Sequence, residues 1–218
     1  MGRPENPIAG PPHRQALVRY LREFRASTQV TYQEMPVLYP SVSAATHKRT
    51  ASGENVPRWP RTLDFCVACF AATSVDPRPV PDAKKLRRLW LKARMEERGV
   101  LHLKKPRPEY IADQADLSQA LSALYEHAGA PPLREVQANA GGSVHLPLST
   151  LARIVSRETL PADERQLLAF LTGCGLHDQA QQRKWSRAWA KVTLPKLTSA
   201  DVLHALYEQA SEIVHESV

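Results

Sequence analysis

The residues best suited to chemistry in this sequence lie in the stretch SAATHKRTASG, which runs from Ser43 to Gly53. His47, Lys48 and Arg49 stand together there and supply hydrogen-bond donors and positive charge. Donors of this kind, on a helix that starts with small residues, suit the phosphates and base edges of double-stranded DNA. The alternative is a solvated surface helix, which is what a basic run usually forms.

Other residue types offer little catalytic chemistry. The eight histidines are scattered, and the sequence has no H-E-x-x-H motif, glycine-rich phosphate loop or G-x-S-x-G motif. Cys66 and Cys69 form one C-x-x-C pair inside an apolar run, and Cys174 stands alone, so a zinc site would lack ligands. We interpret the cysteines as buried core thiols, with a thiol switch or metal binding as alternatives. We expect neither an enzyme nor a cofactor.

Charge is distributed unevenly along the 218 residues. Residues 1–105 contain 19 lysines and arginines against 9 aspartates and glutamates, a formal charge of +10, whereas residues 106–218 carry −3. A basic half suits nucleic acid or an anionic membrane surface. No run of about 18 apolar residues is present, and no signal peptide precedes the basic start. We therefore expect a cytoplasmic, nucleoid-associated protein that does not enter a membrane.

Helical periodicity runs through most of the chain and predicts an all-α protein. In the first half, apolar stripes predict long helices over residues 13–26, 59–72 and 83–97. These helices would form the bundle that positions the basic stretch.

Two short helices are expected between the first and the second of these long helices. Thr31 and Glu34 form a capping box that predicts a helix from residue 32, and Pro36 in its second turn must shorten or bend it. Ser43 is a good N-cap for the next helix, at about 43–52.

Two short helices joined by a tight turn describe a helix-turn-helix unit. In such a unit the second helix enters the major groove of DNA with its N-terminal turn. Ala44 and Ala45 would permit close approach, and the basic run lies around the same end. The stretch 43–52 is therefore predicted to be a recognition helix.

The motifs TYQEM, SAATHKRTASGENVPRW and LDFCVAC, in this order, resemble actinobacterial Xre-type helix-turn-helix regulators. The typical pattern of that family is TYREM, then S-x-x-T-L-S-R-x-x-S-G, then L-P and a helix that ends near a cysteine. The resemblance covers about residues 1–98, including the start MGRPENP. It implies a transcriptional regulator with these DNA contacts: Gln33 at a phosphate; Ser43, Ala44, Thr46, His47, Lys48 and Arg49 at bases and backbone; Arg58 and Trp59 at the next helix start.

Two further residues extend the DNA hypothesis. Arg3 lies in a basic N-terminal arm, and such arms enter the minor groove in other helix-turn-helix proteins; a disordered tail is the alternative. His47 stands where the Xre-type pattern has a core leucine. It either approaches a phosphate or fills that core position.

The second half of the chain repeats the first more faintly. The repeat alignment pairs Thr46 with Thr150, Arg49 with Arg153, Pro57 with Pro161 and, with small gaps, Trp90 with Trp189. The predicted architecture is two related helix-turn-helix bundles in tandem plus a C-terminal amphipathic helix. The predicted boundaries are an arm at 1–12, a DNA-binding domain at 13–98, a linker at 99–115, a degenerate domain at 116–193 and a C-terminal helix at 194–218.

The second half is expected to act differently from the first. Because its charge is −3, a scaffold, a dimer contact or a site for a protein partner is favoured over a second DNA-binding head. Its tryptophans, Trp185 and Trp189, lie on helical stripes with core residues, as Trp90 does in the first half. The C-terminal helix carries an apolar stripe that could close its own bundle or form a homodimer; the stripe comprises Val202, Leu206, Tyr207, Ala210, Ile213 and Val214.

The sequence as a whole favours a transcriptional regulator that binds double-stranded DNA through its first half. The alternative is a protein-interaction adaptor whose helix-turn-helix fold has lost DNA binding. The charge of the first half favours the regulator.

Overall fold

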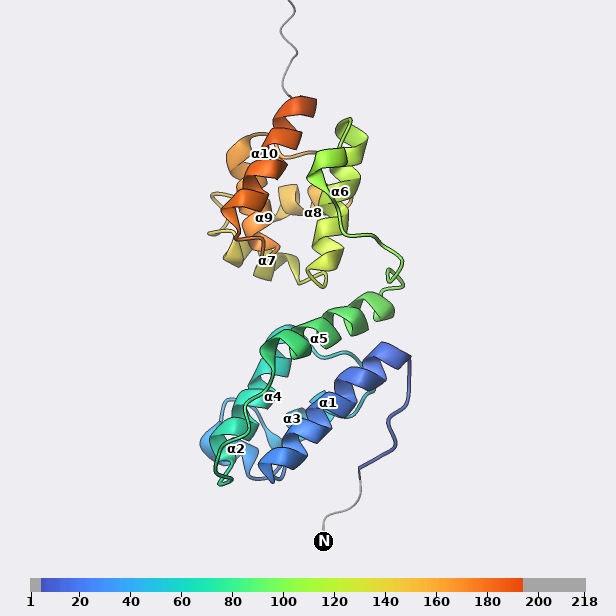
Figure 1. The fold of residues 1–218 in the computed structure, drawn as a ribbon. Coiled ribbons are helices and arrows are strands. Elements are labelled where there is room, and N and C mark those ends of the chain that lie inside the picture. The colour runs from blue at the N-terminus through green and yellow to red at the C-terminus, as the bar shows by residue number, and fades with distance from the viewer. Residues whose placement is uncertain (1–4, 194–218) are drawn as a thin grey trace, which may run out of the picture. The chain divides into compact units, whose positions relative to one another are not determined.

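The computed structural model describes residues 5–193, and these form helices joined by loops (Figure 1). The described chain is all-α, so the fold class predicted from the periodicity is confirmed. The elements are, in order, α1 (Pro12–Thr28), α2 (Met35–Leu38), α3 (Ala44–Thr50), α4 (Trp59–Ala72), α5 (Ala83–Glu97), the 3₁₀ helix η1 (Pro108–Tyr110), α6 (Gln114–His127), α7 (Leu133–Asn139), α8 (Leu148–Val155), α9 (Glu164–Gly173) and α10 (Gln179–Thr193).

The chain divides into two compact units. Within the described residues, unit 1 comprises residues 5–105 together with Ala123–Pro131, and unit 2 comprises Pro106–Ser122 and residues 132–193. The first boundary falls inside the stretch 99–115, for which the sequence predicts a linker. The end of α6 and the turn after it belong to unit 1, which the sequence does not indicate.

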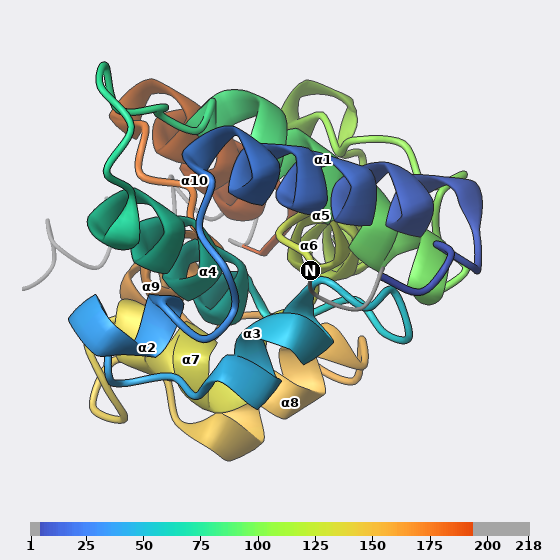
Figure 2. The same ribbon diagram turned by 90° about the horizontal axis from the view of Figure 1, so that it is seen from below.

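Unit 1 is built around α1, which packs against α4 and α5. Leu17, Leu21 and Phe24 form its buried face, as their spacing predicts, and burial of each contributes about 1.5–3 kcal/mol relative to exposure. The helices α4 and α5 begin at the predicted residues; at α5, the Asp82 carboxylate accepts the Lys85 N–H at 2.9 Å. Figure 2 shows α1 on one side of α4 and the short helices α2 and α3 on the other.

Trp90 of α5 joins the core of unit 1 to the start of α4. Its indole N–H donates to the Pro57 carbonyl oxygen at 2.7 Å, and its ring centroid lies 5.4 Å from that of Trp59. The segment after α6 approaches the same ring so closely that a Cβ built on Gly129 would overlap with it. Trp90 is buried, which confirms its predicted place in the core.

The same hydrogen bond occurs in unit 2. The Trp189 indole N–H, on α10, donates to the Pro161 carbonyl oxygen at 3.0 Å. These are the residues that the repeat alignment pairs with Trp90 and Pro57. At the offset that pairs Thr46 with Thr150, His47 corresponds to Leu151, and both side chains are buried.

The second helix begins later than predicted. The Glu34 carboxylate accepts the Thr31 N–H at 2.7 Å, which is one half of the predicted capping box, but residues 32–34 form a turn and α2 starts at Met35. Pro36 is therefore the second helical residue and does not lie in a second turn. A proline in the first turn removes an N–H that has no intrahelical partner, so Pro36 fits the start of α2 instead of breaking it.

His47 belongs to the core of unit 1. Its side chain is 1% exposed, and neither ring nitrogen has a hydrogen-bond partner among the residues that the structure describes. Its ring lies edge-on to Phe65 with the centroids 6.1 Å apart. Burial lowers the pKa of His47 below the ordinary 6.5; the Asp64 charge opposes this shift and the Arg61 charge adds to it. The prediction that His47 contacts DNA is therefore wrong, because its imidazole faces the interior. It fills the position of the leucine in the Xre-type pattern.

Replacing His47 by leucine is expected to raise the free energy of unfolding of unit 1 by about 1–3 kcal/mol at neutral pH, because two buried polar atoms without partners disappear. The pKa of His47 is lower in the folded chain than in the unfolded chain. Protonation therefore favours unfolding, and the parent should lose stability as the pH falls below about 6.5. Denaturant unfolding at several pH values should show a smaller loss in His47→Leu. A variant less stable than the parent at neutral pH would contradict the core role.

Substitution of alanine for Gly129 is expected to destabilise unit 1 more than the same change at Gly99. Both glycines have positive φ, 95° and 70°, so an alanine at either position carries about 1–2 kcal/mol of backbone strain. At Gly129 the new Cβ also meets the Trp90 ring, whereas nothing lies within 4 Å of a Cβ at Gly99. Urea unfolding should therefore separate the two variants by at least about 1 kcal/mol. Equal losses would mean that the Trp90 contact does not constrain unit 1.

Candidate nucleic-acid interface

The helix α3 lies within the stretch 43–52 that the sequence predicts to be a recognition helix. Ser43 is its N-cap, as predicted, and its hydroxyl oxygen accepts the Thr46 N–H at 3.3 Å. The Ser43 and Thr46 hydroxyls also lie 3.0 Å apart. The helix ends at Thr50 with Ala51 as its C-cap, and in the turn that follows Gly53 has φ 87°, a conformation that favours glycine.

The two faces of α3 differ in character. His47 and Thr50 are buried against the core, while Ala45, Lys48 and Arg49 are exposed. Neither Lys48 nor Arg49 has an acidic partner among the residues that the structure describes. Their charges are therefore available for an external anion.

Arg22 of α1 holds the C-terminal end of α3 in place. Its guanidinium donates to the carbonyl oxygens of Ala51 at 2.9 Å and Ser52 at 3.3 Å. Glu5 forms ion pairs with Arg22 at 2.8 Å and with Arg25 at 2.9 Å, and it accepts the Tyr32 hydroxyl at 2.7 Å. The part of the predicted arm that begins at Glu5 is thus anchored to unit 1. The sequence does not reveal this set, because nothing in the spacing of these residues links them.

The other predicted DNA contacts have different surroundings. Gln33 and Arg58 are exposed, and no hydrogen bond or ion pair of either side chain is found in the described chain. Trp59 is half-buried, with its ring against Trp90 and beneath the Arg87 guanidinium, 4.6 Å from the ring centroid. Trp59 therefore acts as a packing residue at the start of α4. Arg3 lies outside the described residues.

Unit 2 presents less positive charge at the corresponding place. Arg153, which the alignment pairs with Arg49, lies 3.8 Å from the Glu158 carboxylate. The place of Lys48 is taken by Ala152, and α8 begins after Pro147 without a side-chain cap. The helix α8 therefore lacks a pair of exposed cations like Lys48 and Arg49 on α3.

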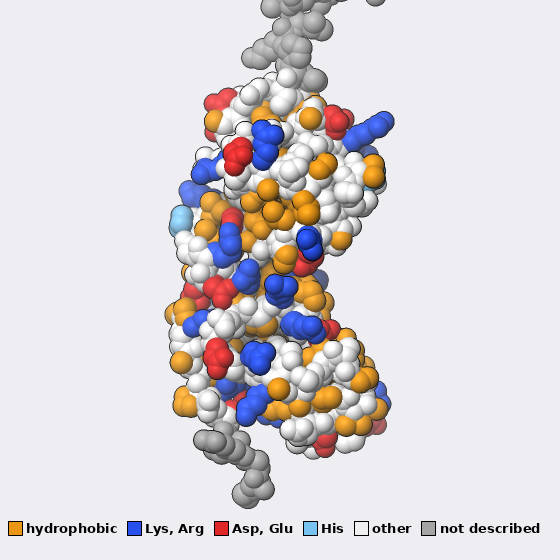
Figure 3. Space-filling model, turned by 180° about the vertical axis from the view of Figure 1, so that it is seen from behind, with side chains coloured by type: hydrophobic (Ala, Val, Ile, Leu, Met, Phe, Trp, Pro, Cys, Tyr) orange, Lys and Arg blue, Asp and Glu red, His pale blue; other side chains and the backbone are white. Residues whose placement is uncertain are grey.

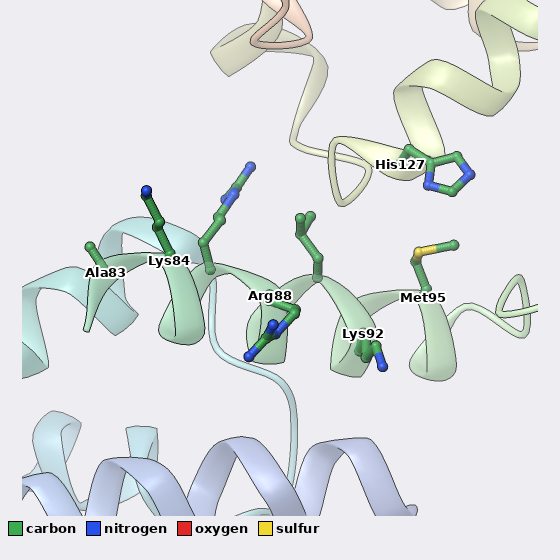
Figure 4. A pocket seen from close by; sticks show the side chains of 8 residues that line it. Ala83, Lys84, Arg88, Lys92, Met95 and His127 are labelled. Atoms are coloured by element: carbon green, nitrogen blue, oxygen red, sulfur yellow. The ribbon is translucent and has the colours of Figure 1, made fainter. Parts of the chain in front are cut away.

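A groove of about 560 Å³ runs along α5. Leu91 and Met95 form its apolar floor, Lys84 and Arg88 lie along it, and Figure 4 shows Met95 beside His127 at one end. An apolar floor beside cations suits an amphipathic ligand with negative charge. The groove is not predictable from the sequence, in which α5 has only the pattern of a packing helix.

The three cysteines are buried and unpaired, which confirms their interpretation as core thiols. Burial raises the pKa of each thiol to about 12, so none is a thiolate at neutral pH. Among the residues that the structure describes, no three His, Cys, Asp or Glu side chains are grouped to hold a metal ion.

Within residues 5–193, none of the helices combines the length and the apolar character that crossing a bilayer requires.

Comparison with known proteins gave no match: no family model, no curated protein and no solved structure matches the chain.

Proposed function

We propose that unit 1 binds double-stranded DNA with α3 in the major groove, and that the protein is a transcriptional regulator. The observation that carries this proposal is the pair of exposed cations Lys48 and Arg49, which have no acidic partner in the described chain. Cations of this kind bind phosphates by releasing condensed counterions, and arginine also recognises the guanine edge.

The start of α3 supports the same function. Ala44 and Ala45 are small, so the N-terminal turn can approach a base edge without steric hindrance. Gln33, just before α2, and Arg58, the N-cap residue of α4, are exposed and supply further polar and charged groups for phosphates. These elements have the order of a helix-turn-helix unit, in agreement with the resemblance to Xre-type regulators.

Unit 2 has a different role in this proposal. Its half of the sequence carries −3, and Arg153 faces Glu158. A surface of this charge contributes little electrostatic attraction to the binding of a polyanion such as DNA. We assign unit 2 to scaffolding or to a protein partner, and the proposed DNA function implies a cytoplasmic, nucleoid-associated protein.

The double variant Lys48→Ala/Arg49→Ala is expected to weaken DNA binding by about 2–6 kcal/mol, because one base or phosphate contact contributes about 1–3 kcal/mol. The slope of log K against log salt concentration should also become shallower by about one unit for each phosphate contact that the substitutions remove. Genomic fragments retained by the parent protein would be sequenced, and fluorescence anisotropy on a recovered duplex would then give both quantities.

The matched control is Arg153→Ala/Arg157→Ala on unit 2, which removes the same number of charges on α8 and directly after it. It should change the binding free energy by less than about 1 kcal/mol. Both variants must melt like the parent. Equal losses from the two pairs, or a parent that retains no duplex at low salt, would contradict the proposal.

A further inference from the structure

The helix α4 carries apolar side chains on two opposite faces. Its inner face, with Phe65 and Cys69, is buried in unit 1. Its outer face exposes three apolar residues at spacing i, i+4, i+7, the spacing of a helix-packing stripe, and α2 beside it exposes two more. We name these five residues the α2–α4 patch: Val37, Leu38, Leu63, Val67 and Phe70.

The α2–α4 patch concentrates exposed apolar surface in one place. Its members are between 37% and 73% exposed, and they are five of the nine large hydrophobic residues most exposed in the described chain. Figure 3 shows hydrophobic side chains gathered over α2 and α4, at the lower right of that view. Single exposed hydrophobic residues are ordinary, whereas a contiguous group marks an interaction surface.

We propose that the α2–α4 patch is the contact between two copies of this chain, with the two α4 helices antiparallel about a two-fold axis at Val67. In such a pair Val67 meets Val67 of the second copy, and Leu63 meets the turn that carries Phe70 of the second copy. The stripe is therefore complementary to itself, which is the condition for a closed two-fold dimer. This contact is independent of DNA binding by α3.

Charged residues at the two ends of the α2–α4 patch also favour a second copy of the chain as its partner. The Arg78 guanidinium lies 5.8 Å from the Phe70 ring centroid, and Arg78 has no acidic partner among the described residues. At the other end of α4, the Asp64 carboxylate accepts Tyr39 at 2.9 Å and Arg61 at 3.1 Å, which leaves it further acceptor capacity. In the antiparallel pair, Arg78 of each copy comes to the end that holds Asp64 of the other, and two equivalent ion pairs form.

The chain's own segment 194–218 is a poorer occupant. It contains four acidic residues and a single basic one, Lys196, so it can pair with Arg78 but supplies only one cation for Asp64. A second copy supplies Asp64 for the Arg78 end of the patch and Arg78 for the Asp64 end.

The test compares Val67→Glu with Val144→Glu in the full chain by sedimentation equilibrium. Val144 is 91% exposed in unit 2 and lies outside the patch, so it receives the same chemical change without touching the proposed contact. Val67→Glu should raise the dissociation constant of the dimer at least about tenfold, because two carboxylates are brought together at the axis, while Val144→Glu should leave it unchanged. Both variants should melt like the parent.

A second measurement keeps the proposal falsifiable where Val67→Glu fails to fold. Val67→Cys should form an intermolecular disulfide under mild oxidation with copper phenanthroline, whereas Val144→Cys should not, and the three native thiols are buried. A parent chain that is monomeric at high micromolar concentration would overturn the proposal. So would equal cross-linking at both positions, or a dimer that only Leu206→Glu/Ile213→Glu in the C-terminal segment disrupts.

Discussion

The hydrogen bond from the Trp90 indole to the Pro57 carbonyl is the constraint on which unit 1 depends. It satisfies a donor that burial would otherwise leave unpaired, and it fixes α5 against the loop that leads into α4. Trp59 then packs on the Trp90 ring, and the Arg87 guanidinium lies 4.6 Å from both ring centroids. The chain returning after α6 fits beside this cluster because residue 129 is glycine. One indole thus sets the positions of three segments that are distant in the sequence.

The matching bond between Trp189 and Pro161 shows which features the two units share. The shared features belong to the interior, where packing density and the pairing of polar groups leave few alternatives. The differences lie at the surface and at the ends of α3 and α8: Ser43 caps α3, whereas α8 begins after Pro147 without such a cap. A surface substitution changes stability little, so the charge of these helices can differ between the two units while each unit keeps its core.

Local signals in the sequence are sufficient to predict most of the helix boundaries. The start of α5 is predictable because Asp82 caps it. The start of α4 is predictable because Pro60 suits its first turn and its apolar run has the length of a helix. The inclusion of Ala123–Pro131 in unit 1 is not predictable, because it depends on a fit to Trp90 across more than 30 residues of chain. The sequence leaves two alternatives for His47, since a basic run gives no sign of which side chain turns inward.

The sequence also leaves open which face of α4 is buried. Apart from Asp64, the run LDFCVACF is apolar, so hydrophobicity alone does not tell which side of the helix is buried. The orientation is set by contacts at its first turns: Trp59 packs on Trp90, and the Tyr39 hydroxyl donates to Asp64 at 2.9 Å. These contacts direct Phe65 inward and leave Val67 outside. The exposed cations of α3 and the α2–α4 patch consequently share no side chain. A charge change on α3 and an apolar-to-charged change on α4 therefore act on separate properties of the same unit.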